Sequence, residues 1–405
     1  MDKHNIVVLG AGYGGIKALQ QLHGYLKGSK GYQLLLVNKH NYHMFMTQLH
    51  QHAAGTSDTD QVMVPLDTIL EGKDVKFVKG WVDGIDLINR QVLVDHGDIK
   101  LPFKYLVVAL GSEPEYYNIE GLKEYSMSIR SLYSARHVRK SIQQILRQTD
   151  KKPLTFVVGG GGLTGIEFAG ELAFQLKRSA SQYNLFPGDY QIIVVEGAKE
   201  LLPGMDGNMA HYAKETLEEM GVQVITGALI KRVTEHKIHL TSGKDLSYSL
   251  LLWAGGIKGN KVLAQSGLKT DARGRVEVNQ YLQSLVDPEV YVVGDSALAK
   301  DPKDNKVVTP TAQAAIQQGA VAAYNIYADI TGKEKRVYQP VVLGTLVSIG
   351  RGKAFGNVKT FKFKGITASW LKEAIPVKYR YSLGGLKMFT QTHKQREDIQ
   401  LQGEL

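Results

Sequence analysis

The chain has 405 residues, enough for two or three domains, and its 43% hydrophobic and 22% charged residues are ordinary for a globular protein. It contains no cysteine, which excludes disulfide-stabilised scaffolds, thiolate metal sites and redox-active cysteine pairs. The formal net charge is +10, and the segment from Arg351 to Arg396, with eleven Lys or Arg and one acid, carries an excess of that size. We expect no signal peptide, because the first residues lead directly into a short strand. We also expect no membrane-spanning helix, because no run of 18 apolar residues exists.

A glycine-rich turn follows the first predicted strand. The apolar run Ile6–Leu9 leads into Gly10-x-Gly12-x-x-Gly15, and residues 5–37 are predicted to form a strand, a turn, a helix and a second strand. In such a turn the first glycine permits the bend, the second lets a pyrophosphate approach the backbone, and the third lets helix and strand pack closely. The helix N-terminus then offers N–H groups to the phosphates.

The residue after the second strand commonly is an acid that binds a ribose. Here it is Asn38, followed by Lys39. An amide can still hydrogen-bond a ribose, and this departure favours the adenosine of FAD over NAD at the first turn.

Residues 40–65 form a polar and aromatic loop with four histidines, at positions 40, 43, 50 and 52. Their spacing fits no standard zinc pattern, and no cysteine or acidic cluster accompanies them. We therefore expect no metal and interpret the loop as packing on a cofactor. Short strands are predicted at 75–78, 91–94 and 105–110, the last ending at Gly111, where a ligand could approach the backbone. A basic helix is predicted at 133–148.

A second turn of the same kind occurs in mid-chain. Strand 154–158 leads into Gly160-x-Gly162-x-x-Gly165, and a strand at 191–195 ends in Glu196. A carboxylate here can accept both ribose hydroxyls and would repel a 2′-phosphate, which favours NADH over NADPH, although Lys199 weakens this preference. The interval to Glu196 is longer than usual, and residues 177–190 are interpreted as an insertion. One such turn is weak evidence, but two suggest a flavin and a nicotinamide in one protein.

Two further strands end in small residues. Strand 249–254 ends at Gly255, and strand 289–293 ends in Gly294-Asp295. An aspartate at a strand end could bind the ribityl hydroxyls of a flavin or could simply cap a helix. The helix that follows, to about residue 330, carries Gln313 and Gln317 four residues apart on one face.

Two acids lie one turn apart in the helix after the second glycine turn, in an otherwise apolar stretch. Burial of Glu171 would raise its pKa towards working pH and suit it to proton transfer. The alternative is that Glu167 and Glu171 are helix acids that interact with the dipole.

These residues resemble a known family, the type II NADH dehydrogenases, over residues 6–388. The resemblance rests on the motifs Gly10-Ala-Gly-Tyr-Gly-Gly15, Asn38-Lys39, Gly160 to Glu171, Glu196, Gly294-Asp295 and Ala312-Gln-x-Ala-x-Gln317. Members of that family are single-subunit, FAD-containing NADH:quinone oxidoreductases of respiratory membranes that do not pump protons. The polar tail 391–405 departs from the short basic ending expected of the family.

The resemblance implies a set of site residues. Glu171, Gln313 and Gln317 are the expected catalytic residues. The residues expected to contact FAD or NADH are Gly10, Gly12, Tyr13, Gly14, Gly15, Asn38, Lys39, Thr47, Val82, Ala109, Gly111, Gly160, Gly162, Thr164, Gly165, Glu196, Gly255, Gly294, Asp295 and Ala312.

The C-terminal segment has the pattern of a membrane-surface element. Trp370, Leu371, Ala374 and Ile375 fall on one helix face, Pro376 is expected to end or kink that helix, and aromatic, apolar and basic residues alternate from Lys378 to Phe389. A docking or dimer face is the competing interpretation. Nucleic acid is disfavoured, because no binding motif accompanies the charge.

The predicted fold is α/β with two Rossmann-type domains of the pyridine nucleotide-disulfide oxidoreductase type. A split FAD domain takes 1–118 and 284–332, an NADH domain takes 119–283, and a membrane-contact region takes 333–405. The predicted function is hydride transfer from NADH to flavin and then two-electron reduction of a quinone, at the cytoplasmic face of an anionic cell membrane, with a homodimer as a candidate assembly. The alternatives are reduction of a soluble acceptor and an NADH-sensing flavoprotein.

Overall fold

The computed structural model describes residues 3–148 and 152–390, which form two compact units. Unit 1 comprises Met1–Met44, Val64–Glu113 and Ile257–Val342, and unit 2 comprises Phe45–Met63, Pro114–Gly256 and Leu343–Leu405. Each unit is built on its own parallel sheet.

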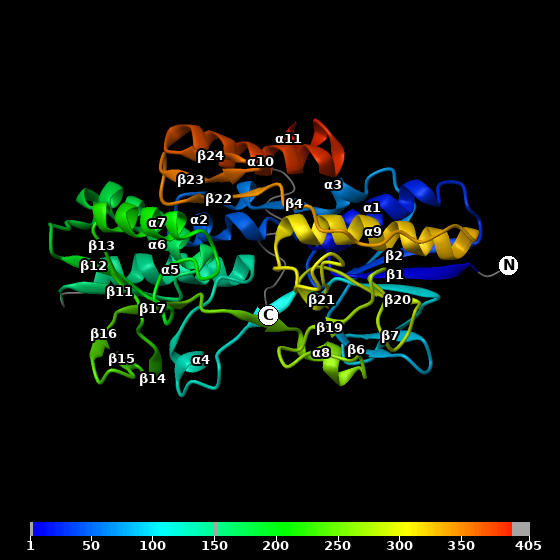
Figure 1. Ribbon diagram of the computed structural model, residues 1–405, viewed down its shortest axis with the longest axis horizontal. Coiled ribbons are helices and arrows are strands. Elements are labelled where there is room, and N and C mark those ends of the chain that lie inside the picture. Colours follow the sequence, from blue (N-terminus) through cyan, green and yellow to red (C-terminus); the bar gives the residue numbers. More distant parts are fainter. Residues whose placement is uncertain (1–2, 149–151, 391–405) are drawn as a thin grey trace. The chain divides into compact units, whose positions relative to one another are not determined.

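Unit 1 contains a five-stranded parallel sheet in the order β20-β9-β1-β2-β5. Its strands are β1 (His4–Leu9), β2 (Tyr32–Asn38), β5 (Val75–Lys79), β9 (Tyr105–Val108) and β20 (Val290–Val292). Helices α1 (Tyr13–Tyr25) and α9 (Ala312–Thr331) lie side by side against it (Figure 1). They approach closely because Gly319 has no side chain: a Cβ there would lie 2.3 Å from the Gly14 oxygen.

A second, antiparallel layer of unit 1 consists of β6 (Val82–Asp86), β7 (Gln91–Val94) and β8 (Ile99–Pro102), with α8 (Lys261–Gln265) packed on β6. Val92, Val94 and Leu263 are fully buried between this layer and the parallel sheet, whose Val7 and Leu106 belong to the same core. Burial on both faces explains the uninterrupted apolar runs of the parallel strands.

Unit 2 contains a four-stranded parallel sheet in the order β13-β12-β11-β17. Its strands are β11 (Leu154–Gly159), β12 (Tyr190–Val195), β13 (Val222–Ile225) and β17 (Leu250–Trp253), and its long helices are α5 (Leu132–Gln148), α6 (Leu163–Ser179) and α7 (Gly207–Glu219). A small antiparallel sheet of β14 (Ile230–Thr234), β15 (Lys237–Leu240) and β16 (Asp245–Ser247) completes its core with Val233, Ile238 and Leu246.

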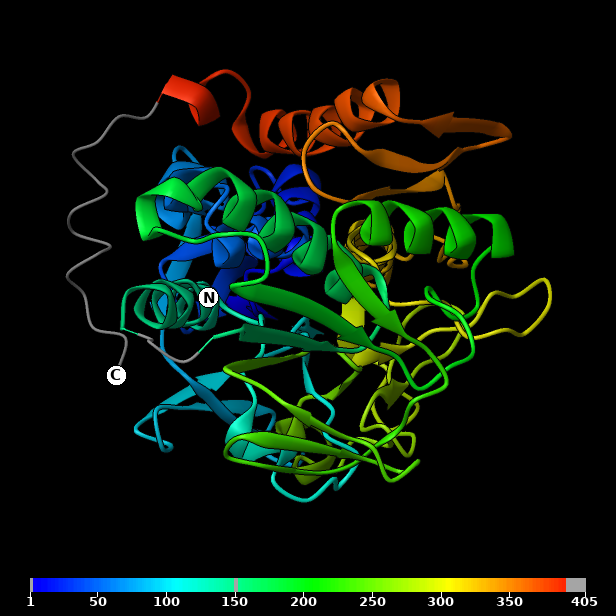
Figure 2. The same cartoon turned by 90° about the vertical axis from the view of Figure 1, so that its left-hand side faces the viewer.

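The C-terminal part of unit 2 is an antiparallel sheet covered by one helix. Strands β22 (Gly344–Ser348), β23 (Ala354–Val358) and β24 (Phe361–Lys364) pair in order, and α10 (Ile366–Gly384) packs on them (Figure 2). Pro376 is predicted to end or kink this helix. The first alternative is wrong, because α10 continues for two more turns beyond it. Proline has no N–H and so removes one backbone hydrogen bond, and the helix persists here despite that loss.

The remaining elements are short. They are α2 (Leu49–Ala54), α3 (Leu66–Leu70), α4 (Leu122–Tyr125), α11 (Lys387–Thr390), β3 (Tyr42–Met44), β4 (Met63–Pro65), β10 (Ser112–Pro114), β18 (Ile257–Gly259), β19 (Val276–Glu277), β21 (Ala297–Leu298), and the 3₁₀ turns η1 (Met46–Gln48), η2 (Thr59–Gln61), η3 (Ser181–Tyr183) and η4 (Gly294–Ser296).

The extents of the two units differ from the predicted domain boundaries at four places, the shortest of which is 114–118, predicted in the FAD domain but part of unit 2. Residues 257–283 belong to unit 1, because Val262, Leu263 and Leu268 complete its core. Residues 45–63 belong to unit 2, where α2 packs on α5 and α6. Residues 333–342 belong to unit 1, along α9, and the rest of the predicted C-terminal region belongs to unit 2. The polar tail 391–405 lies outside the described residues.

Candidate functional site

The first glycine turn has the backbone that its sequence predicts. Gly10 adopts a φ of +95°, and a Cβ at Gly15 would lie 2.0 Å from the Gly10 oxygen, so both positions require glycine. At Gly12, by contrast, an added Cβ would meet nothing within 4 Å. Gly12 is also the N-cap of α1 and provides no side-chain cap. The turn therefore leaves open space and uncapped N–H groups, the surroundings that a pyrophosphate needs.

Two side chains hold Ala11 in this turn. Asn38 accepts a hydrogen bond from the Ala11 nitrogen (3.0 Å) and donates to the His40 oxygen (2.7 Å). The fully buried His43 lies 2.7 Å from the Ala11 oxygen through Nδ1, and burial lowers the pKa of His43 to about 4. A neutral ring with its proton on Nδ1 donates this bond. Asn38 and His43 therefore both hold the turn, a role that the sequence predicted for neither, and the ribose contact of Asn38 stays a prediction.

The second turn repeats the backbone with a different side chain. Gly160 has a φ of +111°, a Cβ at Gly165 would lie 1.9 Å from the Gly160 oxygen, and Gly162 faces open space. Glu196 accepts hydrogen bonds from the Gly161 nitrogen (2.6 Å, Oε2) and from the Ala198 nitrogen (2.7 Å, Oε1). Gly162 caps α6 without a side-chain bond, so this turn also fits a pyrophosphate.

A group of predicted flavin-contacting residues lies together in unit 1. Ser112 donates to Asp295 Oδ2 (2.6 Å), and Ser296 donates to the Gly111 oxygen (3.1 Å). The Gly294 nitrogen donates to the buried Gln318 (2.7 Å). The sequence prediction included Gly111, Gly294 and Asp295 but not Gln318, which is buried in α9.

Several other predicted contact residues have structural neighbours that explain their identity. Lys39 lies over the Trp81 ring, 4.8 Å from its centroid, and burial lowers the pKa of Lys39. Tyr13 meets the His43 ring edge-on at 5.4 Å. A Cβ at Gly255 would lie 2.2 Å from the Trp253 ring.

The other predicted cofactor positions fall in both units. In unit 1, Val82 begins β6, Ala312 begins α9, Ala109 lies against the first turn and Gly14 lies against α9. In unit 2, Thr164 is in α6 and Thr47 is in η1.

The two predicted catalytic glutamines lie in the first turns of α9, and both are half-buried. Gln317 donates to the Val341 oxygen (2.8 Å) and accepts from the Val341 nitrogen (2.9 Å). Its amide is therefore held at both ends by one backbone residue.

Glu171 is 1% exposed, and its Oε2 is buried with no hydrogen-bond partner among the described residues. Burial raises the pKa of Glu171. The positive charge of Arg351 and the polar side chains of Thr56 and Gln51 act in the opposite direction, but the effect of burial is larger. A carboxyl group in these surroundings retains its proton to higher pH than an exposed one.

Glu167, one turn earlier, is also buried but is ionised. Burial disfavours its charge, but Lys372 (2.8 Å), His50 and the Ser348 nitrogen together lower its pKa. His50 Nδ1 lies 3.7 Å from Glu167, and burial lowers the pKa of His50, against the opposing effect of the Glu167 charge. The sequence alone does not identify Lys372 or His50 as partners, because Lys372 lies 205 residues from Glu167 along the chain.

The four histidines of the loop are divided between the units, His40 and His43 in unit 1 and His50 and His52 in unit 2. Among residues 3–148 and 152–390, no three His, Asp or Glu side chains cluster as metal ligands.

Residues 4–319 match the model of a family described as pyridine nucleotide-disulphide oxidoreductase. The chain is 30% identical to the type II NADH:quinone oxidoreductase of Staphylococcus saprophyticus over 396 residues, which cover 95% of this chain and 97% of that protein. The chain belongs to the type II NADH:quinone oxidoreductases. The predicted α/β fold and the predicted family are thereby confirmed.

Solved structures agree on the fold of this type II family member. It is similar to the Plasmodium falciparum NDH2 in complex with NADH, with a TM-score of 0.85, 20% identity and 96% of each chain covered. It is also similar to the sulfide:quinone oxidoreductase of Aquifex aeolicus, with a TM-score of 0.78, 20% identity and 96% of each chain covered.

Proposed function

We propose that this chain is an FAD-dependent NADH:quinone oxidoreductase that does not pump protons. The observation that carries the proposal is the presence of two open glycine turns on two separate parallel sheets, held by different side chains, in a member of this family. When bound, FAD supplies the redox chemistry, because it can accept a hydride from NADH and give two electrons to a quinone.

The first turn is the proposed FAD pyrophosphate site, with Gly10, Gly12 and the α1 N-terminus. Asp295, with Gly294 and Gly111 beside it, is the proposed ligand of the ribityl chain, since its carboxylate lies at the end of β20 and accepts from Ser112. The second turn, with Gly162 and Glu196, is the proposed NADH site. In both turns the residues that touch the backbone fix its shape before any ligand arrives.

Glu171 is the proposed proton donor for quinone reduction, which consumes two protons. Its raised pKa keeps a proton on the carboxyl group, and the unpartnered Oε2 can hold it. Gln313 and Gln317 are the proposed hydrogen-bond partners of a quinone or flavin carbonyl. Glu167 is unsuited to donation, because Lys372 stabilises its ionised form.

A Glu171→Gln variant tests the proton donor. We expect quinone reoxidation to slow by roughly 100-fold, with flavin reduction by NADH unchanged. The wild-type quinone rate should fall as pH rises through the raised pKa of Glu171, and this dependence should disappear in the variant. The exposed Glu218→Gln serves as the matched control. Equal loss in both half-reactions would refute the role.

The exposed apolar side chains of the C-terminal helices are the proposed membrane contact. Trp370 is 72% exposed, Leu386 is 74% exposed, and Ile366, Ile375, Val377, Tyr381 and Phe389 are also exposed. This set differs from the predicted apolar face, because Leu371 packs on the core under α10 and Leu383 and Met388 are buried. Within the described residues, no helix has the length and apolarity needed to span a bilayer.

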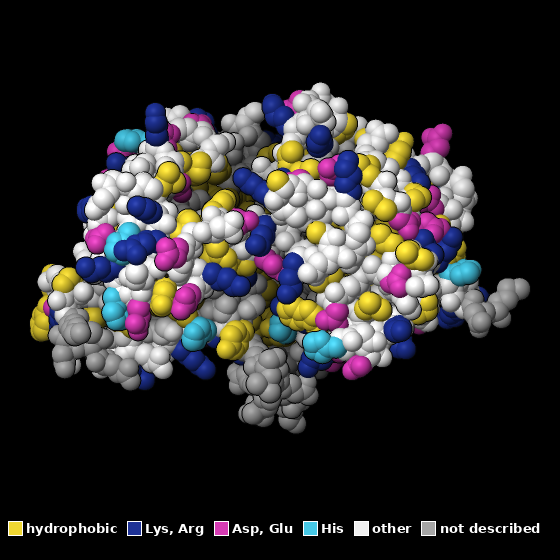
Figure 3. Space-filling view, turned by 90° about the horizontal axis from the view of Figure 1, so that it is seen from below, with side chains coloured by type: hydrophobic (Ala, Val, Ile, Leu, Met, Phe, Trp, Pro, Cys, Tyr) yellow, Lys and Arg dark blue, Asp and Glu magenta, His cyan; other side chains and the backbone are white. Residues whose placement is uncertain are grey.

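The basic residues of this segment divide in the same way. Arg380 donates to the Asp60 oxygen (2.7 Å) and Lys372 pairs with Glu167, whereas Lys378 and Lys387 are exposed and can contact anionic lipids. Figure 3 shows a different face from the one that carries α10, and there Lys and Arg side chains are interspersed with Asp and Glu. The proposed location is the cytoplasmic face of the cell membrane, and a homodimer is compatible with it.

Vesicle binding tests this contact. Trp370→Ser with Ile375→Ser should reduce co-sedimentation with vesicles that contain phosphatidylglycerol, whereas Ile88→Ser, at a residue 94% exposed in unit 1, should leave it unchanged. Equal binding by all three proteins would refute the assignment.

The function itself is tested by anaerobic addition of NADH to the flavin-loaded protein, followed by a short-chain quinone. Rapid bleaching and rapid reoxidation are expected. Bleaching without reoxidation by quinone would favour a soluble acceptor, and slow turnover with NADH-dependent oligomerisation would favour a sensor.

A further inference from the structure

We propose that residues 333–342, here called the strap, position Gln317 for quinone reduction and that Asn325 is the residue that holds the strap. This inference rests on the proposed function. The strap follows α9 and returns along it in the opposite direction, as the orange trace beside α9 shows (Figure 1). It has no regular secondary structure of its own, so side chains must satisfy its backbone.

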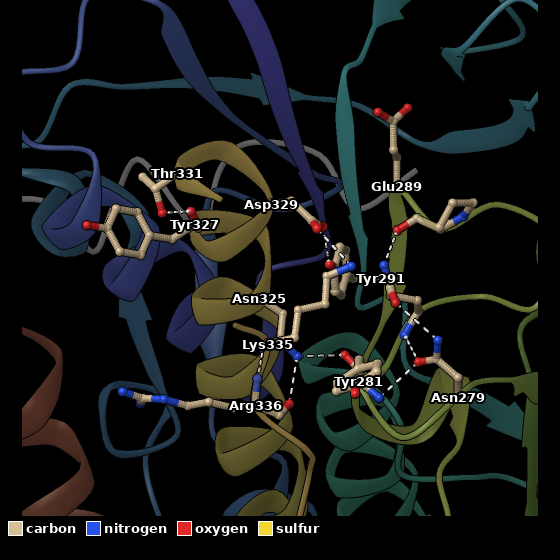
Figure 4. A network of polar contacts seen from close by, with 12 residues as sticks. Asn279, Tyr281, Glu289, Tyr291, Asn325, Tyr327, Asp329, Thr331, Lys335 and Arg336 are labelled. Carbon is tan, nitrogen blue, oxygen red and sulfur yellow. Dashed lines mark hydrogen bonds and ion pairs between the residues drawn. The ribbon is translucent and has the colours of Figure 1, made fainter. Parts of the chain in front are cut away.

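Asn325 makes the first of two paired contacts with the strap. Its side chain is fully buried, accepts a hydrogen bond from the Arg336 nitrogen (2.7 Å) and donates to the Arg336 oxygen (2.9 Å) (Figure 4). It also donates to the Tyr281 oxygen (3.0 Å). An amide has two donors and one carbonyl oxygen, so Asn325 uses both donors for structure. No smaller or apolar side chain can replace these bonds.

Charged and aromatic contacts reinforce this end of the strap. Lys335 forms an ion pair with Asp329 (2.7 Å), and Asp329 accepts from the hydroxyl of Tyr291 (2.6 Å), which is fully buried in β20 (Figure 4). The Arg336 guanidinium lies 3.6 Å from the centroid of the Tyr324 ring. The strap is therefore connected through α9 to the strand that ends in Gly294-Asp295.

Gln317 makes the second paired contact, with both the nitrogen and the oxygen of Val341. Asn325 and Gln317 are eight residues apart, about 12 Å along a helix, and the five residues from Arg336 to Val341 extend at most about 17 Å. The strap can therefore span this distance without being fully extended, and the Tyr338 nitrogen, between the two contacts, donates to the Gln280 oxygen (2.8 Å).

The paired contact fixes the orientation of the Gln317 amide. Nε2 must face the Val341 oxygen and Oε1 the Val341 nitrogen, so one N–H and one lone pair of the amide remain for a ligand. A free glutamine side chain would lose rotamer freedom on binding, whereas this one is already ordered. The strap accordingly makes Gln317 a preoriented partner for a carbonyl group.

The test is Asn325→Ala, with Thr331→Ala as the matched control, because the Thr331 hydroxyl bonds only within α9, to the Tyr327 oxygen. We expect faster trypsin cleavage after Lys333, Lys335 and Arg336, read by mass spectrometry. We also expect a rise of roughly threefold to tenfold in KM for quinone. Anaerobic flavin reduction by NADH should be unchanged. The control should match the wild type in all three measurements.

Faster cleavage with unchanged quinone kinetics, or unchanged cleavage, would overturn the proposal and leave the proposed function intact. A wild-type protein that quinone does not reoxidise would instead refute the proposed function. If Asn325→Ala does not fold, Asp329→Asn removes the charge that holds Lys335 but keeps an oxygen for Tyr291. It should give the same changes to a smaller extent, and their absence would also overturn the proposal.

Discussion

The two glycine turns share one backbone design but differ in the side chain that holds it. In each turn the residue after the first glycine donates its N–H to a side chain at the end of the neighbouring strand. Ala11 donates to Asn38, the last residue of β2, and Gly161 donates to Glu196, the first residue after β12. Strand register places these acceptors equivalently, since Leu9 pairs with Val37 and Gly159 with Val195.

The first turn has an uncharged acceptor and a buried neutral histidine, whereas the second has a carboxylate that binds two backbone nitrogens. The comparison separates what the backbone requires, which is common to both turns, from what distinguishes the two ligands. On the proposed assignment, the first turn places no carboxylate beside the adenosine of FAD, and the carboxylate of the second turn would repel the 2′-phosphate of NADPH.

The shared backbone predicts the largest effect. Gly15→Ala and Gly165→Ala should each prevent stable folding of their unit, with a cost above about 4 kcal/mol, because the new Cβ would overlap a backbone oxygen at 2.0 Å or 1.9 Å. The measurement is soluble yield and the urea unfolding midpoint. A well-folded variant at either position would show that the two turns are not constrained alike.

The open positions should separate the two ligands. Gly12→Ala and Gly162→Ala add a methyl group where the protein offers free space, so the fold should survive and only the approach of a pyrophosphate should suffer. We expect Gly12→Ala to be purified with little FAD. We expect Gly162→Ala to retain FAD but to show a KM for NADH raised about tenfold. Loss of FAD from both variants would break the proposed division of ligands.

The same comparison shows what the sequence could and could not predict. Gly10, Gly12 and Gly15 act within a few residues, so their spacing alone predicts the turn, and the apolar runs predicted at 75–78, 91–94 and 154–158 are all strands. His43 acts across 32 residues and Lys372 across 205, and no local pattern marks such partners. Periodicity showed that α10 is apolar, but only the position of β22 and β23 decides that Leu371 faces the core and Trp370 does not.

Acid should weaken the first turn before the second. Because burial lowers the pKa of His43 to about 4 from 6.5, the folded protein disfavours the protonated ring. The resulting stability is complete above the unfolded pKa and is lost as pH falls from about 6.5 to about 4. Between pH 7 and pH 5 we expect His43 alone to account for a loss of about 2 kcal/mol in the unfolding free energy of unit 1.

The measurement for His43 is urea unfolding followed by flavin fluorescence at both pH values. His43→Gln should remove this contribution. The pKa of His40 is also lowered to about 4, by burial and by the charges of Lys39 and Lys79, and its contribution is the same in both proteins. An unchanged pH dependence in His43→Gln would show that the histidine does not hold the turn.

The smallest expected effect distinguishes the two roles of Glu196. Glu196→Gln should retain one of the two hydrogen bonds to the backbone and lower the unfolding free energy by about 1 kcal/mol. Asn38→Asp should have a similar effect, because it keeps the acceptor for the Ala11 nitrogen but loses the hydrogen bond to the His40 oxygen. If the carboxylate also binds the ribose hydroxyls of the cofactor, Glu196→Gln should raise KM for NADH and lower KM for NADPH. If it only holds the turn, both KM values should rise together, and the preference for NADH must then arise from other residues of unit 2. Asn38→Asp should change neither KM, because that residue belongs to the other turn.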